Sequence, residues 1–277
     1  MVYPDRTWLT EKIQALAPEV IIVRDLFSPL SLMTILIARQ LKIKTILYNQ
    51  SPLEEDEKLS YKFLKIIGIT PRVRITPTRF TSLDFNSKTN SFYVPLIVSE
   101  NRDARLRHYT AAGVVRILFV GKFTMPRKKH FLMLDACKEV LRVTPVTLTM
   151  VGFSTPESQE YEQSITEYIH HLGISDKVRI ITNVDPKDMA SVYLNHDLFV
   201  LPSVDEPFSI SPLEAMSYGL PVIVTDTNGA RGCIDNTRDG RIVTSGDINS
   251  LVEAILFFCR NGTDLEAAGQ HALEKIA

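Results

Sequence analysis

The sequence predicts an α/β protein built from two doubly wound domains. Short apolar strands alternate with helices along most of the 277 residues, and this alternation is typical of parallel sheets covered by helices. The segment 99–113 is polar and charged, has no apolar period and comes directly before a new strand, as a domain boundary does. We therefore expect an N-terminal domain over residues 1–112 and a C-terminal domain over residues 113–277.

The first half is expected to contain two strand–helix units and two further strands. Its loops open at the carboxyl ends of strands, where parallel sheets bind ligands. The expected elements are a helix at 7–16, a strand at 19–23, a helix ending near 41, a strand at 44–48, a helix at 59–67, and strands at 73–76 and 92–98.

The second half alternates without a break, and its six strands, each paired with a helix, predict a complete doubly wound domain. The strands are expected at 116–120, 146–151, 178–181, 198–201, 222–224 and 241–243, and the helices at 129–143, 157–172, 186–194, 212–218, 248–259 and 264–276.

The whole sequence is organised around the segment 197–226. Two fully apolar strands with a short helix between them predict a right-handed βαβ unit in the interior of a parallel sheet. Ser211 is expected to cap this helix, Pro212 fits its first turn, and Gly219 ends it.

Two glutamates mark this unit: Glu206 in the loop after the first strand, and Glu214 on the helix. The helix start beside Glu206 offers backbone amides to an anion. Two other interpretations stay open, because Ser211 and Glu214 have the spacing of a capping box, and Glu206 could be a solvated loop carboxylate.

The complete string closely resembles the signature of family-4 retaining glycosyltransferases of GT-B fold. The two glutamates stand eight residues apart with Pro-Phe-Ser between them, and Pro-Leu-Glu-Ala-Met-x-x-Gly-Leu-Pro-Val-Ile follows. The resemblance implies two Rossmann-like domains with a cleft between them. It also implies that Glu206 contacts the donor sugar, that Glu214 binds the ribose of the nucleotide, and that the backbone of Phe208, Ser209 and Ile210 holds the diphosphate. The family usually has Gly where this chain has Pro207 and Ser209.

A basic loop follows the strand at 116–120, and a helix follows the loop. Negatively charged phosphate oxygens bind favourably beside cationic side chains and beside the positive N-terminal end of a helix. In the family an Arg or Lys after the glycine and a Lys before the helix grip the diphosphate, and these positions correspond to Lys122 and Lys128. Arg127 and Lys129 are register alternatives to Lys128, and a solvated basic turn is the structural alternative.

Further roles follow from the same resemblance. Asn183 and Val184 come after a strand and correspond to a loop that lines the nucleobase pocket through backbone atoms. Asn49 stands where the family often has a His near the donor sugar, and Asn can hydrogen-bond a hydroxyl without carrying a proton. Asp25 is the titratable candidate of this half, either catalytic or a helix-start carboxylate. No metal is implied, since cations and amides hold the diphosphate.

The resemblance covers the second half nearly end to end and is looser in the first. The family's N-terminal domain is larger and opens with a strand and a Gly-rich loop that this sequence does not show, so the chain resembles a truncated glycosyltransferase. We expect a retaining hexosyltransferase that uses a UDP-, GDP- or ADP-sugar as donor and a glycan or lipid-linked acceptor. The alternative is a non-catalytic nucleotide-binding remnant or partner subunit.

Composition is that of a soluble globular protein, with 45% hydrophobic and 23% charged residues. The start lacks the apolar centre of a signal peptide, and the three cysteines show no metal-binding spacing, so a cytoplasmic location is expected. Residues 1–112 contain 16 Lys and Arg against 11 Asp and Glu, which leaves peripheral contact with an anionic membrane open. No run of like charge points to nucleic acid.

Overall fold

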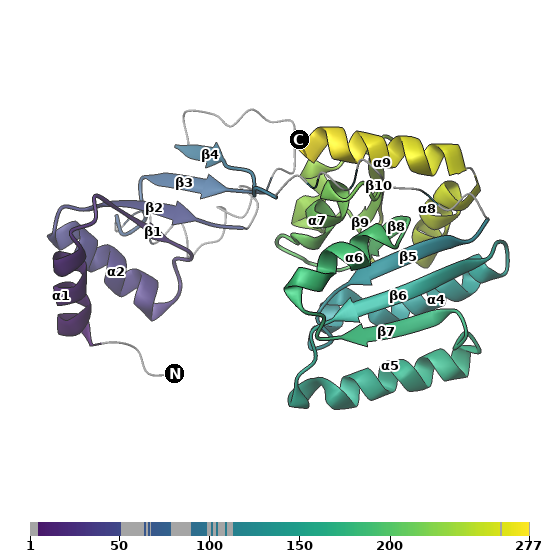
Figure 1. Ribbon diagram of the computed structural model, residues 1–277. Coiled ribbons are helices and arrows are strands. Elements are labelled where there is room, and N and C mark those ends of the chain that lie inside the picture. The colour runs from purple at the N-terminus through teal and green to yellow at the C-terminus, as the bar shows by residue number, and fades with distance from the viewer. Residues whose placement is uncertain are drawn as a thin grey trace. The chain divides into compact units, whose positions relative to one another are not determined.

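The computed structural model describes residues 5–50, 64, 66, 68–78, 90–98, 101, 104, 109, 113–260 and 262–276. The chain divides into two compact units, Met1–Leu96 and Ile97–Ala277 (Figure 1). The division falls before residue 113, where the sequence places the domain boundary. The hydroxyl of Tyr109 donates a hydrogen bond to the carbonyl of Gly219, so this part of the intervening segment packs with the second unit.

The first unit contains a parallel sheet with the strand order β1-β2-β3-β4. Val23, Leu26, Ile35 and Leu47 form its buried cluster, because alternate strand residues and one face of α2 point to the same side of the sheet. The elements are α1 (Arg6–Leu16), β1 (Val20–Val23), α2 (Pro29–Gln40), β2 (Lys44–Tyr48), β3 (Val73–Thr76) and β4 (Ser91–Tyr93).

The strand expected at 92–98 is shorter than the sequence suggested and ends at Tyr93. Pro95 explains the early end, because proline has no N–H to donate to a sheet ladder. The helix expected at 59–67 lies outside the described residues, apart from 64 and 66.

The second unit contains a six-stranded parallel sheet with the order β10-β9-β8-β5-β6-β7 (Figure 1). Its strands are β5 (Val115–Val120), β6 (Val146–Gly152), β7 (Val178–Thr182), β8 (Leu198–Leu201), β9 (Val222–Thr225) and β10 (Gly240–Val243). Its helices are α4 (His130–Leu141), α5 (Gln159–Leu172), α6 (Met189–Leu194), α7 (Ser211–Ser217), α8 (Ile248–Arg260) and α9 (Gly262–Ile276).

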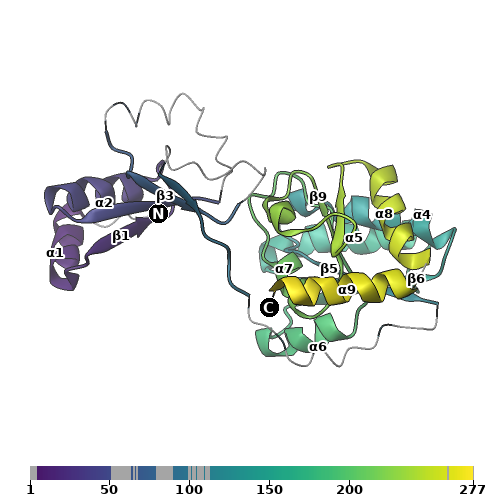
Figure 2. The same cartoon turned by 90° about the horizontal axis from the view of Figure 1, so that it is seen from above.

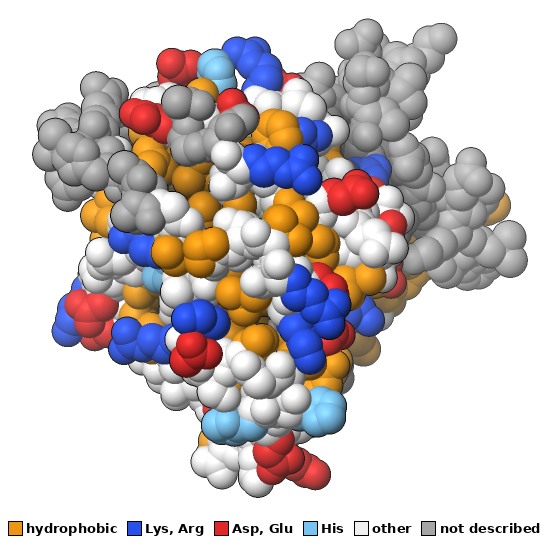
Figure 3. All heavy atoms as spheres, turned by 90° about the vertical axis from the view of Figure 1, so that its right-hand side faces the viewer, with side chains coloured by type: hydrophobic (Ala, Val, Ile, Leu, Met, Phe, Trp, Pro, Cys, Tyr) orange, Lys and Arg blue, Asp and Glu red, His pale blue; other side chains and the backbone are white. Residues whose placement is uncertain are grey.

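Helices cover both faces of this sheet. α4, α5 and α8 pack on one face, while α7 and α9 pack together on the other (Figure 2). Every residue of β8 and β9 is buried, which confirms that these fully apolar strands lie inside the sheet. On the face of this unit seen in Figure 3, side chains of both charges are interspersed.

A buried ion pair fixes the start of the central strands. The carboxylate of Asp197, which is fully buried, accepts hydrogen bonds from Nε and Nη2 of Arg116 at 2.8 and 2.7 Å, and a third from the Arg116 backbone N–H at 2.9 Å. These contacts hold β8 beside β5, so that the loops after both strands open at the same edge of the sheet.

None of the helices in the described part of the chain combines the length and the apolar composition that crossing a bilayer requires.

Candidate functional site

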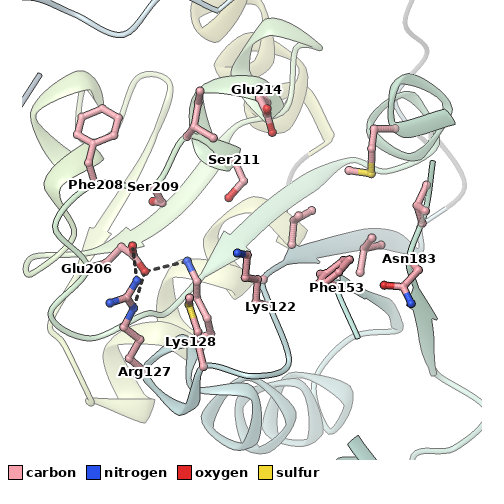
Figure 4. A pocket seen from close by; sticks show the side chains of 18 residues that line it. Lys122, Arg127, Lys128, Phe153, Asn183, Glu206, Phe208, Ser209, Ser211 and Glu214 are labelled. Atoms are coloured by element: carbon pink, nitrogen blue, oxygen red, sulfur yellow. Dashed lines mark hydrogen bonds and ion pairs between the residues drawn. The ribbon is translucent and has the colours of Figure 1, made fainter. Parts of the chain in front are cut away.

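A pocket of about 450 Å³ lies at the carboxyl edge of the second sheet. The loops after β5, β6, β7 and β8 all contribute to its walls (Figure 4). Every residue of this unit that the sequence placed in a binding site lines the same pocket. These residues are Lys122, Lys128, Asn183, Val184, Glu206, Phe208, Ser209, Ile210 and Glu214.

The loops after β5 and β6 approach each other closely to form one wall of this pocket. The Gly121 N–H donates to the carbonyl of Val151 at 2.9 Å. A Cβ atom at Gly152 would lie 2.3 Å from the Gly121 carbonyl oxygen, so only glycine fits there. The pocket therefore depends on backbone contact between two adjacent strand ends.

The basic loop after β5 brings three of its cations to the pocket and turns a fourth away. A 3₁₀ turn, Pro126–Lys128, is followed by Lys129 in the left-handed conformation, with φ 58°, before α4 begins. Lys128 is 8% exposed and Arg127 lines the pocket beside it. Lys129 is exposed and lies outside the pocket. Lys122 is exposed at the pocket surface.

Glu206 is a buried carboxylate rather than a solvated one, with 5% of the residue exposed. Its Oε2 lies 2.8 Å from Nζ of Lys128 and 3.3 Å from Nε of Arg127 (Figure 4). The Arg127 carbonyl also accepts the Val204 N–H at 2.9 Å, which joins the two loops. Burying a carboxylate is costly unless it is paired, and the two cations meet this requirement.

The loop after Glu206 is held from behind by Asn228, which is fully buried and which sequence reasoning missed. Its Oδ1 accepts hydrogen bonds from Oγ of Ser209 and from the Ala230 N–H, both at 3.0 Å, and its Nδ2 donates to Oγ of Ser203 at 3.1 Å. The Asn-Gly pair shortly after a strand was the available signal, since Asn commonly caps such turns.

Gly229, next to Asn228, completes this support. Its N–H donates to the Glu206 carbonyl at 2.9 Å, and a Cβ atom here would lie 1.7 Å from the carbonyl oxygen of Pro207. Among the described residues, the backbone N–H groups of Phe208, Ser209 and Ile210 have no hydrogen-bond partner. These three residues line the pocket, so their unused donors lie at its wall.

Glu214 does not close its own helix. The N-cap of α7 is Ile210, Ser211 is already the first helical residue, and no side chain caps this end. The capping-box interpretation is therefore wrong, as is the expectation that Ser211 caps the helix. The carboxylate of Glu214 instead accepts a hydrogen bond from the hydroxyl of Tyr193 at 2.8 Å. Burial, reinforced by the nearby Glu214 charge, raises the pKa of Tyr193, so the hydroxyl stays protonated.

His130 begins α4 beneath the basic loop and is fully buried. Its Nδ1 lies 3.2 Å from the hydroxyl of Tyr161, and its ring stacks on Phe123 with 5.2 Å between centroids. Burial, together with the charge of Lys128, lowers its pKa to about 4. In the described ranges no three His, Cys, Asp or Glu side chains gather in a way that could hold a metal ion.

Asp25 and Asn49 belong to the first unit. Oδ1 of Asp25 accepts the backbone N–H groups of Phe27 at 3.0 Å and Ser28 at 2.6 Å, which is the helix-start role that the sequence left as an alternative. Burial raises the pKa of this carboxyl, but the hydrogen bonds, led by that from Ser28, outweigh it and lower the pKa overall. The Asn49 N–H donates to the Ile75 carbonyl at 3.0 Å. Catalytic roles for both residues stay predictions.

The fold and the pocket together define a class: an α/β protein whose second unit gathers cations, loop residues and two carboxylates in one pocket at the carboxyl edge of a parallel sheet. Residues 108–275 match the family described as Glycosyl transferases group 1. The chain belongs to this family.

Two curated relatives illustrate the match. The chain is 28% identical over 164 residues to a phosphatidyl-myo-inositol mannosyltransferase of Mycobacterium leprae. This match covers 57% of this chain and 42% of the relative. It is 27% identical over 139 residues to a D-inositol 3-phosphate glycosyltransferase of Corynebacterium urealyticum. This match covers 50% of this chain and 33% of the relative. The chain thus spans less than half the length of these relatives.

Solved structures agree on the fold. A glycosyltransferase from Rickettsia africae superposes with a TM-score of 0.75 at 16% identity. The superposition covers 98% of this chain and 75% of the Rickettsia chain. Anabaena HepE in complex with UDP and glucose superposes with a TM-score of 0.73 at 15% identity. The superposition covers 98% of this chain and 76% of the HepE chain. This likeness confirms the expected α/β fold with parallel sheets, of GT-B type.

Proposed function

We propose that this chain works as a retaining glycosyltransferase that moves a hexose from a UDP-, GDP- or ADP-sugar to a glycan or lipid-linked acceptor. One observation carries the proposal: Glu206, Glu214, Lys122 and Lys128 converge on a single pocket in a chain of the group 1 family. The mannosyl and inositol glycosyltransferases among its relatives, and the UDP in the HepE structure, support this donor class.

The charges of the pocket suit a sugar diphosphate. Lys122, Arg127 and Lys128 supply three positive charges, whereas Glu206 and Glu214 supply two negative ones. The three unused loop amides add hydrogen-bond donors that need no reorganisation when an anion arrives. A diphosphate bound here would be stabilised further as its bond to the sugar breaks and negative charge accumulates on the leaving oxygen.

In this proposal the two carboxylates divide the donor between them. Glu206 accepts hydrogen bonds from the hexose, and Glu214 accepts them from the ribose. The acceptor hydroxyl forms a bond to the anomeric carbon from the face that the diphosphate leaves, and its proton passes to a diphosphate oxygen. The anomeric configuration is retained without a covalent enzyme intermediate.

The base would occupy the end of the pocket formed after β6 and β7. The side chain of Asn183 is fixed there, because its Oδ1 accepts the Ser154 N–H at 2.9 Å. The exposed ring of Phe153 and the backbone of Val184 complete this end of the pocket. Asn49 and Asp25 keep their proposed contacts to substrate, and the basic first 112 residues keep a proposed contact with an anionic membrane surface.

Isothermal titration of the full chain with UDP, GDP and ADP, and then with their glucose and mannose derivatives, tests the donor proposal. We expect at least one diphosphate to bind with 1:1 stoichiometry, and no binding of any of them contradicts the proposal. Turnover is measured as nucleotide released with a panel of inositol, glycan and lipid-linked acceptors, and proton NMR of the product reports whether the anomeric configuration is retained. Binding without any turnover would remove the enzymatic part.

A further inference from the structure

Tyr193 is locked in place beside the pocket. It lies on α6, is 2% exposed, and donates its hydroxyl hydrogen bond to Oε2 of Glu214 at 2.8 Å. Its ring stacks on Tyr218, which follows α7, with 5.0 Å between centroids and 12° between ring planes. A buried ring stacked on a second ring has little freedom to turn, so the hydroxyl keeps its direction.

This contact limits what Glu214 can do. One carboxylate oxygen is engaged by a hydroxyl whose raised pKa keeps it a donor, while the residue still lines the pocket (Figure 4). A carboxylate only accepts hydrogen bonds, so on the pocket side Glu214 can pair only with a ligand group that donates one. Without Tyr193 the carboxylate could rotate and lose this selectivity.

We propose that Tyr193 is a positioning residue that holds Glu214 in the orientation required to select ribonucleotides over deoxyribonucleotides. The inference rests on the proposed function, because it assumes that a nucleoside diphosphate occupies the pocket. It concerns Tyr193 acting through Glu214 and assigns Tyr193 no contact with the ligand.

The test compares Tyr193→Phe with a matched control. Tyr168→Phe removes a hydrogen bond of the same kind, from a Tyr hydroxyl to Oδ1 of Asp135 at 2.7 Å, outside the residues that line the pocket. Titration uses whichever of UDP, GDP or ADP binds best, together with its 2′-deoxy and 3′-deoxy forms. Thermal melting confirms that both variants fold.

The wild-type chain is expected to prefer the ribonucleotide to at least one deoxy form by about tenfold, the size expected for a hydrogen bond to a charged group. Tyr193→Phe should reduce this preference to about threefold or less, and Tyr168→Phe should leave it unchanged. An unchanged preference in Tyr193→Phe overturns the inference, as does a wild-type chain that binds all three forms equally. In both of these outcomes a diphosphate still binds, so only the inference fails. If no diphosphate binds, the proposed function fails as well.

A second variant, Glu214→Gln, needs no change at Tyr193, and an unchanged ribose preference in this variant also overturns the inference. Glu214→Gln leaves an acceptor for Tyr193 but places an amide donor toward the pocket, so the ribose preference should fall by itself. In a double-mutant cycle Tyr193→Phe should add nothing further in the Glu214→Gln background. Additive losses would show that Tyr193 does not act through Glu214 and would overturn the inference.

Discussion

The Nζ atom of Lys128 lies 2.8 Å from Oε2 of Glu206, and the two side chains are only 10% and 5% exposed. Arg127 reaches the same carboxylate from a more exposed position, with 44% of its side chain accessible. Lys128 therefore neutralises a buried charge and also lines the pocket. A bound diphosphate would share this cation with Glu206, so folding and the proposed ligand binding would depend on the same contact.

Replacing Lys128 by Gln should weaken nucleoside diphosphate binding by about tenfold or more, because a charge-assisted contact to phosphate is lost. It should also lower the free energy of unfolding by about 1 to 3 kcal/mol, since Glu206 is left with Arg127 alone. Titration and urea unfolding measure the two effects. Lys129→Gln is the matched control: it removes the same charge one residue further on, outside the pocket, and should change neither quantity. Equal effects of both variants would contradict the assignment.

Asn228→Ala should destabilise the loop that carries the free amides. The substitution leaves Ser209, Ser203 and the Ala230 N–H without their buried partner, which costs about 1 to 3 kcal/mol. Because the loop amides lose their support, we also expect nucleotide affinity to fall by about threefold to tenfold. Asn236→Ala serves as the control, since that exposed side chain accepts one backbone N–H, from Ile242, away from the pocket. An affinity unchanged in Asn228→Ala would refute this role.

The buried pair between Asp197 and Arg116 should matter far more for stability than a surface pair. Asp197→Ala removes three hydrogen bonds from a fully buried carboxylate, and we expect a loss of about 3 kcal/mol in the free energy of unfolding. Glu139→Ala breaks an exposed pair with Arg142 on α4 and should cost less than about 1 kcal/mol. Urea unfolding followed by circular dichroism ranks the two, and similar losses would show that the buried pair has no special weight.

His130 should make stability depend on pH between about 6.5 and 4. Its pKa is lower in the folded than in the unfolded chain, so the unfolded chain binds the proton more tightly. The folded chain is therefore fully stable above the pKa of His130 in the unfolded chain, and it loses stability as the pH falls toward the lower pKa of His130 in the folded chain. This lowering of the His130 pKa corresponds to a loss of about 3 kcal/mol in the free energy of unfolding.

The measurement is the difference in unfolding free energy between pH 7 and pH 4.5, compared for three proteins. His130→Gln should show a smaller loss than the wild-type chain. His171→Gln, at an exposed position of α5, should behave like the wild-type chain. A loss that is the same in all three would mean that other groups cause the acid sensitivity.

Much of the fold follows from local sequence patterns. Apolar runs bounded by turn residues predicted all six strands of the second sheet to within a residue or two at each end. The signal is clearest for β8 and β9, because fully buried parallel strands carry apolar side chains on both faces. The errors have local causes as well: Pro95 ends β4 early, and α7 begins at Ser211 rather than after it. Neither error moves a residue away from the pocket.

The sequence by itself determined the parallel α/β architecture, the two glutamates and the basic loop, since each is recorded in short-range spacing. Only the tertiary structure decided which lysine turns inward, and that Tyr193 and Asn228 support the site. Tyr193 and Glu214 are 21 residues apart and Ser209 and Asn228 are 19 apart, with a strand or a helix between the members of each pair. Such partners meet only once the sheet has brought its carboxyl ends to one edge, so no local pattern contains them.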